Sequence, residues 1–159
     1  MKEDGTIDPI VLQADEGEAI WFLDTLVTVK AASELTGGWA LVEIAAAGHA
    51  PPLHAHHSED EAFYVLEGEM SIICGDRRFN AAAGSFVLIP RGVPHTFKVE
   101  QPAKWLVLAP SGDFMNFVRE MGEPARTRSL PVLEGPPDIE KLNRLAAKHD
   151  MEILGPPPE

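Results

Sequence analysis

Gly48-His-Ala-Pro-Pro-Leu-His-Ala-His-His-Ser-Glu-Asp-Glu-Ala-Phe-Tyr-Val-Leu-Glu-Gly68 is the stretch of this 159-residue chain that decides its fold. His54 and His56 stand two residues apart in it, and Glu61 opens the apolar run that follows. Because side chains alternate between the two faces of a strand, both imidazoles point the same way. Imidazole nitrogens bind zinc-sized cations at about 2.0–2.1 Å, so the two rings can share one ion. The Glu61 carboxylate can reach the same point, and the stretch therefore predicts a metal site built on short strands.

A second stretch, Gly84-Ser-Phe-Val-Leu-Ile-Pro-Arg-Gly-Val-Pro-His95, offers a fourth ligand in His95. Neutral nitrogens and a carboxylate, without thiolate, suit Fe, Ni, Mn, Co, Cu or Zn. Four protein ligands leave open positions on a five- or six-coordinate ion, where a substrate or O₂ can bind. Cys74 is the only cysteine of the chain, which excludes an intrachain disulfide and a Cys-based zinc site.

Short apolar runs separated by turn residues surround these two stretches. The runs cover residues 18–32 (bent near Asp24), 39–46, 61–67, 69–74, 77–81, 84–89, 95–100 and 103–109. Glycine and proline mark the breaks, and helical periodicity is absent from this part of the chain. Strands this short and this regularly spaced predict an antiparallel sandwich or barrel.

Helical periodicity begins after residue 110. Four apolar residues stand at i, i+3, i+4 and i+7 there, namely Phe114, Phe117, Val118 and Met121. This spacing predicts an amphipathic helix over 112–121, and Asp138 is placed to cap a second helix over 139–149. We therefore expect three parts. They are an N-terminal arm (1–17), a barrel (18–110) and a C-terminal helical arm and tail that pack on the barrel (111–159).

The two histidine stretches carry a family resemblance. The first matches the first cupin motif, G-x5-H-x-H-x4-E-x6-G, at every fixed position, which are Gly48, His54, His56, Glu61 and Gly68. The second resembles the second cupin motif, G-x5-P-x-G-x2-H-x3-N, at Gly84, Pro90, Gly92 and His95. It departs at the last position, where Val99 replaces the usual Asn. That Asn is not a ligand in the family, so the departure concerns a pocket hydrogen bond rather than the metal site.

The resemblance implies an all-β fold, the antiparallel double-stranded β-helix or jelly-roll barrel of cupins, here with short C-terminal helices. The residue pattern over 57–69 resembles that of bacterial single-domain quercetin 2,3-dioxygenase-like cupins. Members of that family often hold a first-row metal on three His and one Glu, which implies the ligands His54, His56, Glu61 and His95. In quercetinase-like cupins the Glu is also proposed to accept the substrate hydroxyl proton, which implies a catalytic Glu61.

Strand alternation predicts the walls of the substrate pocket. If Glu61 and His95 face inward, so do the apolar residues two and four positions after them, which are Phe63, Val65, Phe97 and Val99. An apolar mouth favours an aromatic or otherwise largely apolar substrate. The alternative is that these residues only fill the barrel core. The 112–121 helix could likewise cover the mouth as a lid or pack outside it.

Other polar residues near the motifs are interpreted as bystanders. His49 and His57 fill non-motif positions, and His57 alternates away from the ligands. Glu59 and Asp60 are predicted to be solvated acids. His149 is predicted at a helix end, where the helix dipole favours it.

Composition excludes several classes of partner. The chain has 13 Lys and Arg against 25 Asp and Glu, a net charge of −12. This charge argues against nucleic acid and against anionic membrane surfaces. No apolar run approaches the roughly 18 residues that span a bilayer, and the first residues lack a signal-peptide pattern. These features predict a cytoplasmic protein.

Three functions remain open. The first is a metal-dependent dioxygenase that cleaves a flavonol-like or enolic aromatic substrate with O₂, using one divalent first-row transition metal. The second is a metallo-cupin isomerase, lyase or decarboxylase, and the third is a non-catalytic cupin that binds a small molecule. We prefer the first because the predicted ligand set is complete and the residue pattern over 57–69 resembles quercetinases. Open sheet edges and the cupin resemblance also predict a homodimer.

Overall fold

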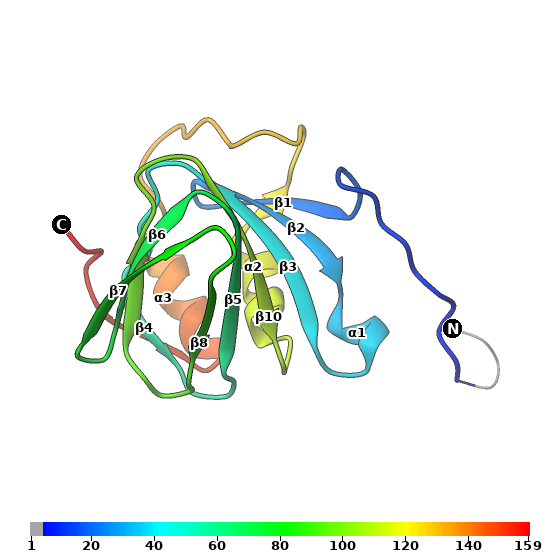
Figure 1. Ribbon diagram of the computed structural model, residues 1–159, viewed down its shortest axis with the longest axis horizontal. Coiled ribbons are helices and arrows are strands. Elements are labelled where there is room, and N and C mark those ends of the chain that lie inside the picture. The colour runs from blue at the N-terminus through cyan, green and yellow to red at the C-terminus, as the bar shows by residue number, and fades with distance from the viewer. Residues whose placement is uncertain (1–4) are drawn as a thin grey trace.

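The structure, a computed structural model, describes residues 5–159 of the chain. Its described strands form two antiparallel sheets that face each other (Figure 1). The first sheet contains β1 (Glu18–Phe22), β2 (Thr25–Ala31), β3 (Ala40–Ala46), β5 (Glu61–Glu67), β8 (Phe86–Ile89), β10 (Ala103–Ala109) and β11 (Glu123–Pro124). Its strands are hydrogen-bonded in the order β11-β1-β2-β3-β10-β5-β8.

The second sheet carries most of the histidines that the sequence singles out. It contains β4 (Leu53–His56), β6 (Glu69–Cys74), β7 (Arg77–Ala82), β9 (His95–Lys98) and β12 (Met151–Gly155). The strand order is β12-β4-β9-β6-β7. The chain crosses repeatedly from one sheet to the other, so the predicted all-β jelly-roll barrel is confirmed. The apolar runs predicted over 61–67, 69–74 and 103–109 are β5, β6 and β10 residue for residue.

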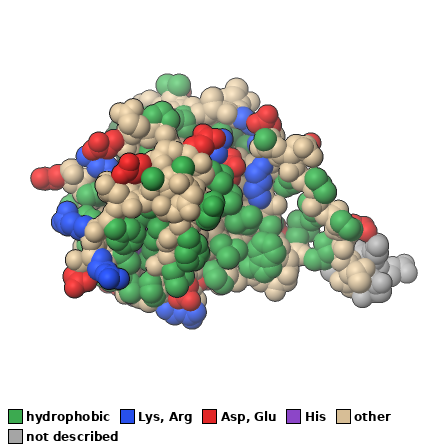
Figure 2. Space-filling model, in the orientation of Figure 1, with side chains coloured by type: hydrophobic (Ala, Val, Ile, Leu, Met, Phe, Trp, Pro, Cys, Tyr) green, Lys and Arg blue, Asp and Glu red, His purple; other side chains and the backbone are tan. Residues whose placement is uncertain are grey.

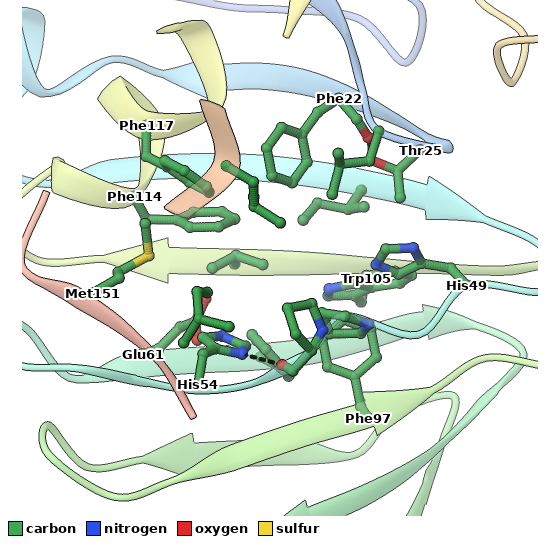
Figure 3. A pocket seen from close by; sticks show the side chains of 18 residues that line it. Phe22, Thr25, His49, His54, Glu61, Phe97, Trp105, Phe114, Phe117 and Met151 are labelled. Atoms are coloured by element: carbon green, nitrogen blue, oxygen red, sulfur yellow. Dashed lines mark hydrogen bonds between the residues drawn. The ribbon is translucent and has the colours of Figure 1, made fainter. Parts of the chain in front are cut away.

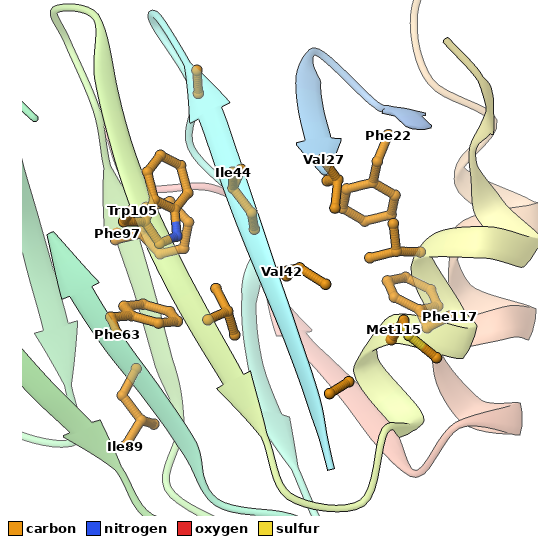
Figure 4. Close-up of a cluster of buried hydrophobic side chains, with 14 of the residues drawn as sticks. Phe22, Val27, Val42, Ile44, Phe63, Ile89, Phe97, Trp105, Met115 and Phe117 are labelled. Atoms are coloured by element: carbon orange, nitrogen blue, oxygen red, sulfur yellow. The ribbon is translucent and has the colours of Figure 1, made fainter. Parts of the chain in front are cut away.

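The core lies between the two sheets and follows the two-residue period of the strands. In β3 every second residue is buried, and β10 buries Trp105 and Val107 in the same alternation. Phe63 of β5 and Phe97 of β9 meet edge to face, with ring centroids 5.8 Å apart (Figure 4). The core therefore contains an aromatic cluster next to the strands that carry the predicted ligands.

Both predicted C-terminal helices are present. They are α2 (Asp113–Met121) and α3 (Ile139–Lys148). Asp138 caps α3 as expected, because its carboxylate accepts a hydrogen bond of 2.9 Å from the backbone N–H of Lys141. The apolar face of α2 buries Met115, Phe117 and Val118 against the barrel. These contacts fix the helix beside the core, as Figure 4 shows.

Three short elements are absent from the sequence prediction, and β11 is one of them. A second is the helix α1 (Ser33–Thr36), which ends where Gly37 adopts a φ of 80°. Residues before the proline tail form β12, which pairs with β4 and so extends the barrel sheet. Residues 1–4 of the predicted arm lie outside the described residues. The division into arm, barrel and helical arm stays a prediction. Among residues 5–159, no helix has the length and apolar character needed to cross a bilayer.

Candidate metal centre and its cavity

The four predicted ligand residues come together at the meeting point of three strands. His54 and His56 lie on β4, His95 opens β9 and Glu61 opens β5. His54 and His95 are direct cross-strand partners. Each of the four residues offers one ligand atom, and these atoms all lie within 4.8 Å of one another. The two-residue spacing on β4 places both of its imidazoles in this cluster, as strand alternation requires.

Three atoms of this cluster are buried and lack a hydrogen-bond partner among residues 5–159. They are Nε2 of His56, Nε2 of His95 and Oε2 of Glu61. The Glu61 oxygen lies 3.4 Å from the His56 nitrogen and 3.3 Å from the His95 nitrogen. Buried polar atoms without partners are costly. A divalent cation held between them would satisfy all three, so the donor set fits a metal ion.

Backbone carbonyls orient two of the imidazoles. Nδ1 of His54 donates to the Pro52 carbonyl at 2.8 Å, and Nδ1 of His95 donates to the Val93 carbonyl at 3.0 Å. With the proton held on Nδ1, the lone pair of Nε2 is free for a metal. In both cases the acceptor stands two residues before the histidine, so the local chain sets the tautomer.

Burial and mutual charge determine the protonation of the cluster. Burial, together with the charges of His95 and His56, lowers the pKa of His54 to about 3. Burial raises the pKa of Glu61, but the neighbouring His56 and His95 outweigh it and hold this pKa at about 2. Burial lowers the pKa of His95, yet the contact with Glu61 outweighs burial and raises it. The ionised Glu61 carboxylate and the neutral His54 imidazole are therefore in the states in which they bind a metal.

A cavity of about 70 Å³ adjoins the cluster, and His54 and Glu61 are part of its wall (Figure 3). Its walls are mainly apolar and include six aromatic side chains, which are Phe22, Phe63, Phe97, Trp105, Phe114 and Phe117. Two of the four predicted pocket residues, Phe63 and Phe97, line it. Val65 and Val99 are fully buried in the core and do not line it. The α2 residues Phe114 and Phe117 close the side of the cavity away from the barrel sheets.

Glu59 corrects one sequence prediction. It was expected to be solvated, but it is 2% exposed. Its carboxylate accepts hydrogen bonds from the Ser111 N–H (3.0 Å), the Ser111 hydroxyl (2.7 Å) and the Phe114 N–H (2.9 Å). The start of α2 supplies these donors because its first backbone N–H groups have no partner within the helix. Glu59 thus connects the loop between β4 and β5 to α2, the helix that closes the cavity.

The other bystander predictions have mixed outcomes. His57 is exposed, as predicted, and pairs with Glu152 at 2.9 Å. Asp60 is partly exposed, with 40% of its side chain accessible, and pairs with Arg91. His49, by contrast, is 6% exposed and lines the cavity, where its Nδ1 lies 2.5 Å from Asp24 Oδ1. No local pattern signals this contact, because the two residues are 25 positions apart on different elements.

Comparisons with known proteins agree with this geometry. Residues 40–109 match the family model described as "Cupin domain". A curated relative, quercetin 2,3-dioxygenase of Bacillus subtilis (strain 168), is 30% identical over 101 residues. These residues are 62% of this chain, and the match spans about 30% of the length of that relative.

Solved structures share the fold. A predicted oxalate decarboxylase from Thermotoga maritima matches with a TM-score of 0.59 at 16% identity, over 64% of this chain and 99% of the other. The oxalate decarboxylase from Bacillus subtilis matches with a TM-score of 0.55 at 23% identity, over 69% of this chain and 31% of the other. At these identities the likeness concerns the barrel and not the reaction.

Proposed function

We propose that this protein, whose residues 40–109 match the cupin domain model, is a metal-dependent dioxygenase that cleaves a flavonol-like or enolic aromatic substrate with O₂. The observation that carries this proposal is the aromatic-walled cavity that has His54 and Glu61 in its wall. Such walls favour an aromatic ring whose hydroxyl lies against the ligand cluster. The 30% identity to a quercetin 2,3-dioxygenase supports the same reaction class.

The residues divide the work as follows. His54, His56, Glu61 and His95 would hold one divalent first-row transition metal. When bound, the ion supplies Lewis acidity that favours the deprotonated form of the substrate hydroxyl. Glu61, ionised at neutral pH, accepts the proton of that hydroxyl on its carboxylate. The aromatic walls hold the ring in place and exclude water. Both atoms of O₂ enter the product of a dioxygenase, so no external reductant is required.

The size of the cavity narrows the substrate class. Drug-sized ligands occupy pockets of about 300–1,000 Å³, whereas this cavity measures about 70 Å³. A single-ring enol or phenol therefore fits better than a three-ring flavonol. A flavonol would require α2 to move, because Phe114 and Phe117 of this helix form part of the cavity wall.

Oxygen consumption by the metal-loaded protein tests the proposal. The protein is loaded separately with Fe²⁺, Ni²⁺, Mn²⁺, Co²⁺, Cu²⁺ and Zn²⁺ and supplied with single-ring enols, phenols and flavonols. We expect O₂ uptake with at least one metal and substrate, and the Glu61→Gln variant should lose about 10²–10⁴-fold in kcat if it retains metal. Metal content is measured on each sample. Glu152→Gln, an exposed carboxylate near His57, is the matched control.

Two outcomes would contradict the dioxygenase proposal. Turnover under strict anaerobiosis would assign the protein to the metallo-cupin isomerases, lyases or decarboxylases. Tight binding of a small molecule without any turnover would assign it to the non-catalytic binding cupins.

We further propose that the protein assembles as a homodimer. β8 is an edge strand of the seven-stranded sheet, and its Phe86 and Leu88 side chains are 65% and 56% exposed. Exposed strand edges and apolar faces need cover in a stable protein.

A further inference from the structure

We propose that Trp105 and His49 form a second subsite, at the end of the cavity away from the metal ligands, that binds a hydroxyl group of the substrate. The inference rests on the proposed function in one respect, which is that the cavity takes the substrate. It assigns a substrate class, namely a compact aromatic compound with one hydroxyl at the metal ligands and another at the far end.

Trp105 supplies an unused hydrogen-bond donor. The side chain lies on β10, is fully buried and lines the cavity. Its indole Nε1 has no hydrogen-bond partner among the described residues. Buried indole N–H groups usually find a partner. Edge-to-face packing on Phe97, with ring centroids 5.5 Å apart, fixes the orientation of the indole. The donor is therefore held in place in the cavity wall without a partner among the described residues.

His49 supplies the matching acceptor. Its Nδ1 donates to Asp24 Oδ1 at 2.5 Å. Burial raises the pKa of Asp24, but the contact with His49 outweighs it and lowers this pKa, so the carboxylate is ionised and holds the imidazole proton on Nδ1. In the neutral imidazole, a proton on Nδ1 leaves the lone pair of Nε2 as an acceptor. No hydrogen bond to Nε2 is found among residues 5–159. The His49 ring also lies against Phe97, at 5.7 Å between centroids, so both polar groups share one aromatic neighbour.

The turn between β1 and β2 is built to present Asp24. Leu23 adopts a φ of 54°, a left-handed conformation that is uncommon for a non-glycine residue. The Thr25 hydroxyl donates to the Phe22 carbonyl at 2.7 Å and closes the turn. Such strain persists where the surrounding structure enforces it, often at binding sites. Leu23 and Thr25 themselves line the cavity.

One donor and one acceptor at the same end of the cavity fit a hydroxyl group. A hydroxyl accepts from the Trp105 N–H and donates to Nε2 of His49, which a carbonyl or an ether cannot do. Figure 3 places His49 and Trp105 toward one end of the cavity and His54 and Glu61 toward the other. The walls between them are apolar. A ring with two hydroxyl groups can bind at both ends of the cavity, whereas a ring with a single hydroxyl can bind at only one.

Calorimetric titration with four small phenols tests the subsite. The full-length protein is loaded with redox-inert Zn²⁺ under anaerobic conditions and titrated with phenol, catechol, resorcinol and hydroquinone. We expect the best dihydroxybenzene to bind about tenfold more tightly than phenol, the value of one well-formed hydrogen-bonded group. Trp105→Phe keeps the aromatic wall and removes the N–H, and His49→Phe keeps a ring and removes the acceptor. In either variant, the affinity for the best dihydroxybenzene should fall to about that for phenol, so that their ratio is about one. The affinity for phenol itself should change little.

Trp39→Phe, which alters an indole that is 45% exposed, is the matched control and should leave the ratio unchanged. Thermal unfolding checks that each variant folds, and if one does not, the other carries the test alone. Equal affinity of the wild type for all four phenols, or an unchanged ratio in both folded variants, would overturn the subsite. The titration is independent of O₂ consumption. If the protein binds dihydroxybenzenes selectively but consumes no O₂, the subsite is supported and only the dioxygenase proposal is contradicted.

Discussion

At the scale of single residues, one step along β4 separates a predicted ligand from a surface group. His56 is 3% exposed and lies in the ligand cluster, whereas the next residue, His57, pairs with Glu152 at the surface. The two-residue period of the strand causes this difference. His57 is therefore a natural control for any experiment on the ligands.

We expect the double substitution His54→Ala with His95→Ala to abolish metal binding. Each imidazole provides a ligand atom, and loss of even a supporting partner lowers metal affinity by about 10–100-fold. Metal content after dialysis, measured by inductively coupled plasma mass spectrometry, should fall from near one ion per chain to background. His57→Ala should retain the wild-type content. Unchanged metal in the double variant would remove the whole assignment of the site.

The sequence allowed the cluster of His54, His56, Glu61 and His95 to be predicted because the spacing of these residues is local. His54 and His56 are related by strand geometry, and Glu61 and His95 occupy fixed positions of recognisable motifs. The hydrogen bonds of Glu59 and His49 near this cluster could not be predicted in this way. Glu59 finds its donors 52 and 55 residues along the chain. His49 finds Asp24 across the fold, and only the packed barrel brings such partners together.

At the scale of elements, strand limits could be predicted where glycine or proline interrupts an apolar run. β5, β6 and β10 have the predicted bounds for this reason. β12 was missed because Met151–Gly155 is short, follows a helix and precedes a proline tail. What makes it a strand is its partner, since Met151 pairs with His56 and Ile153 with His54. A strand whose stability comes from pairing leaves little signal in its own sequence.

The link between Glu59 and α2 predicts a measurable loss of stability. Glu59→Gln keeps the size of the side chain but replaces one acceptor oxygen by an NH₂ group, which cannot accept from Ser111 or Phe114. Charge-assisted bonds at a helix N-terminus also gain from the dipole. We expect the free energy of unfolding in urea to fall by about 1–3 kcal/mol.

The neighbouring Asp60→Asn is the matched control, since Asp60 is partly exposed and pairs with Arg91. It should lower the free energy of unfolding by less than Glu59→Gln does. Equal effects of the two substitutions would show that Glu59 does not anchor α2.

At the scale of the whole molecule, the outer face of the seven-stranded sheet is apolar near its β8 edge. Figure 2 shows hydrophobic side chains gathered where Figure 1 places β5 and β8. Phe86 pairs with Tyr64, and Leu88 pairs with Ala62, which pairs in turn with Leu108. Phe86, Leu88, Tyr64 and Leu108 are 65%, 56%, 46% and 40% exposed, respectively. Because the pairs adjoin one another, these residues form a continuous apolar surface.

This surface predicts a two-fold dimer, in which the same patch of each copy faces the other. Phe86→Glu with Leu88→Glu would place like charges opposite one another in a chain whose net charge is already −12. Light scattering after size-exclusion chromatography should then report 17.3 kDa for the variant and twice that mass for the wild type. Val132→Glu, at a residue that is 91% exposed elsewhere, should stay dimeric. A wild-type protein that is monomeric at tens of micromolar would refute the dimer. A variant that becomes monomeric while keeping its metal would show that assembly and the metal centre are separate properties, as expected from ligands that all come from one chain.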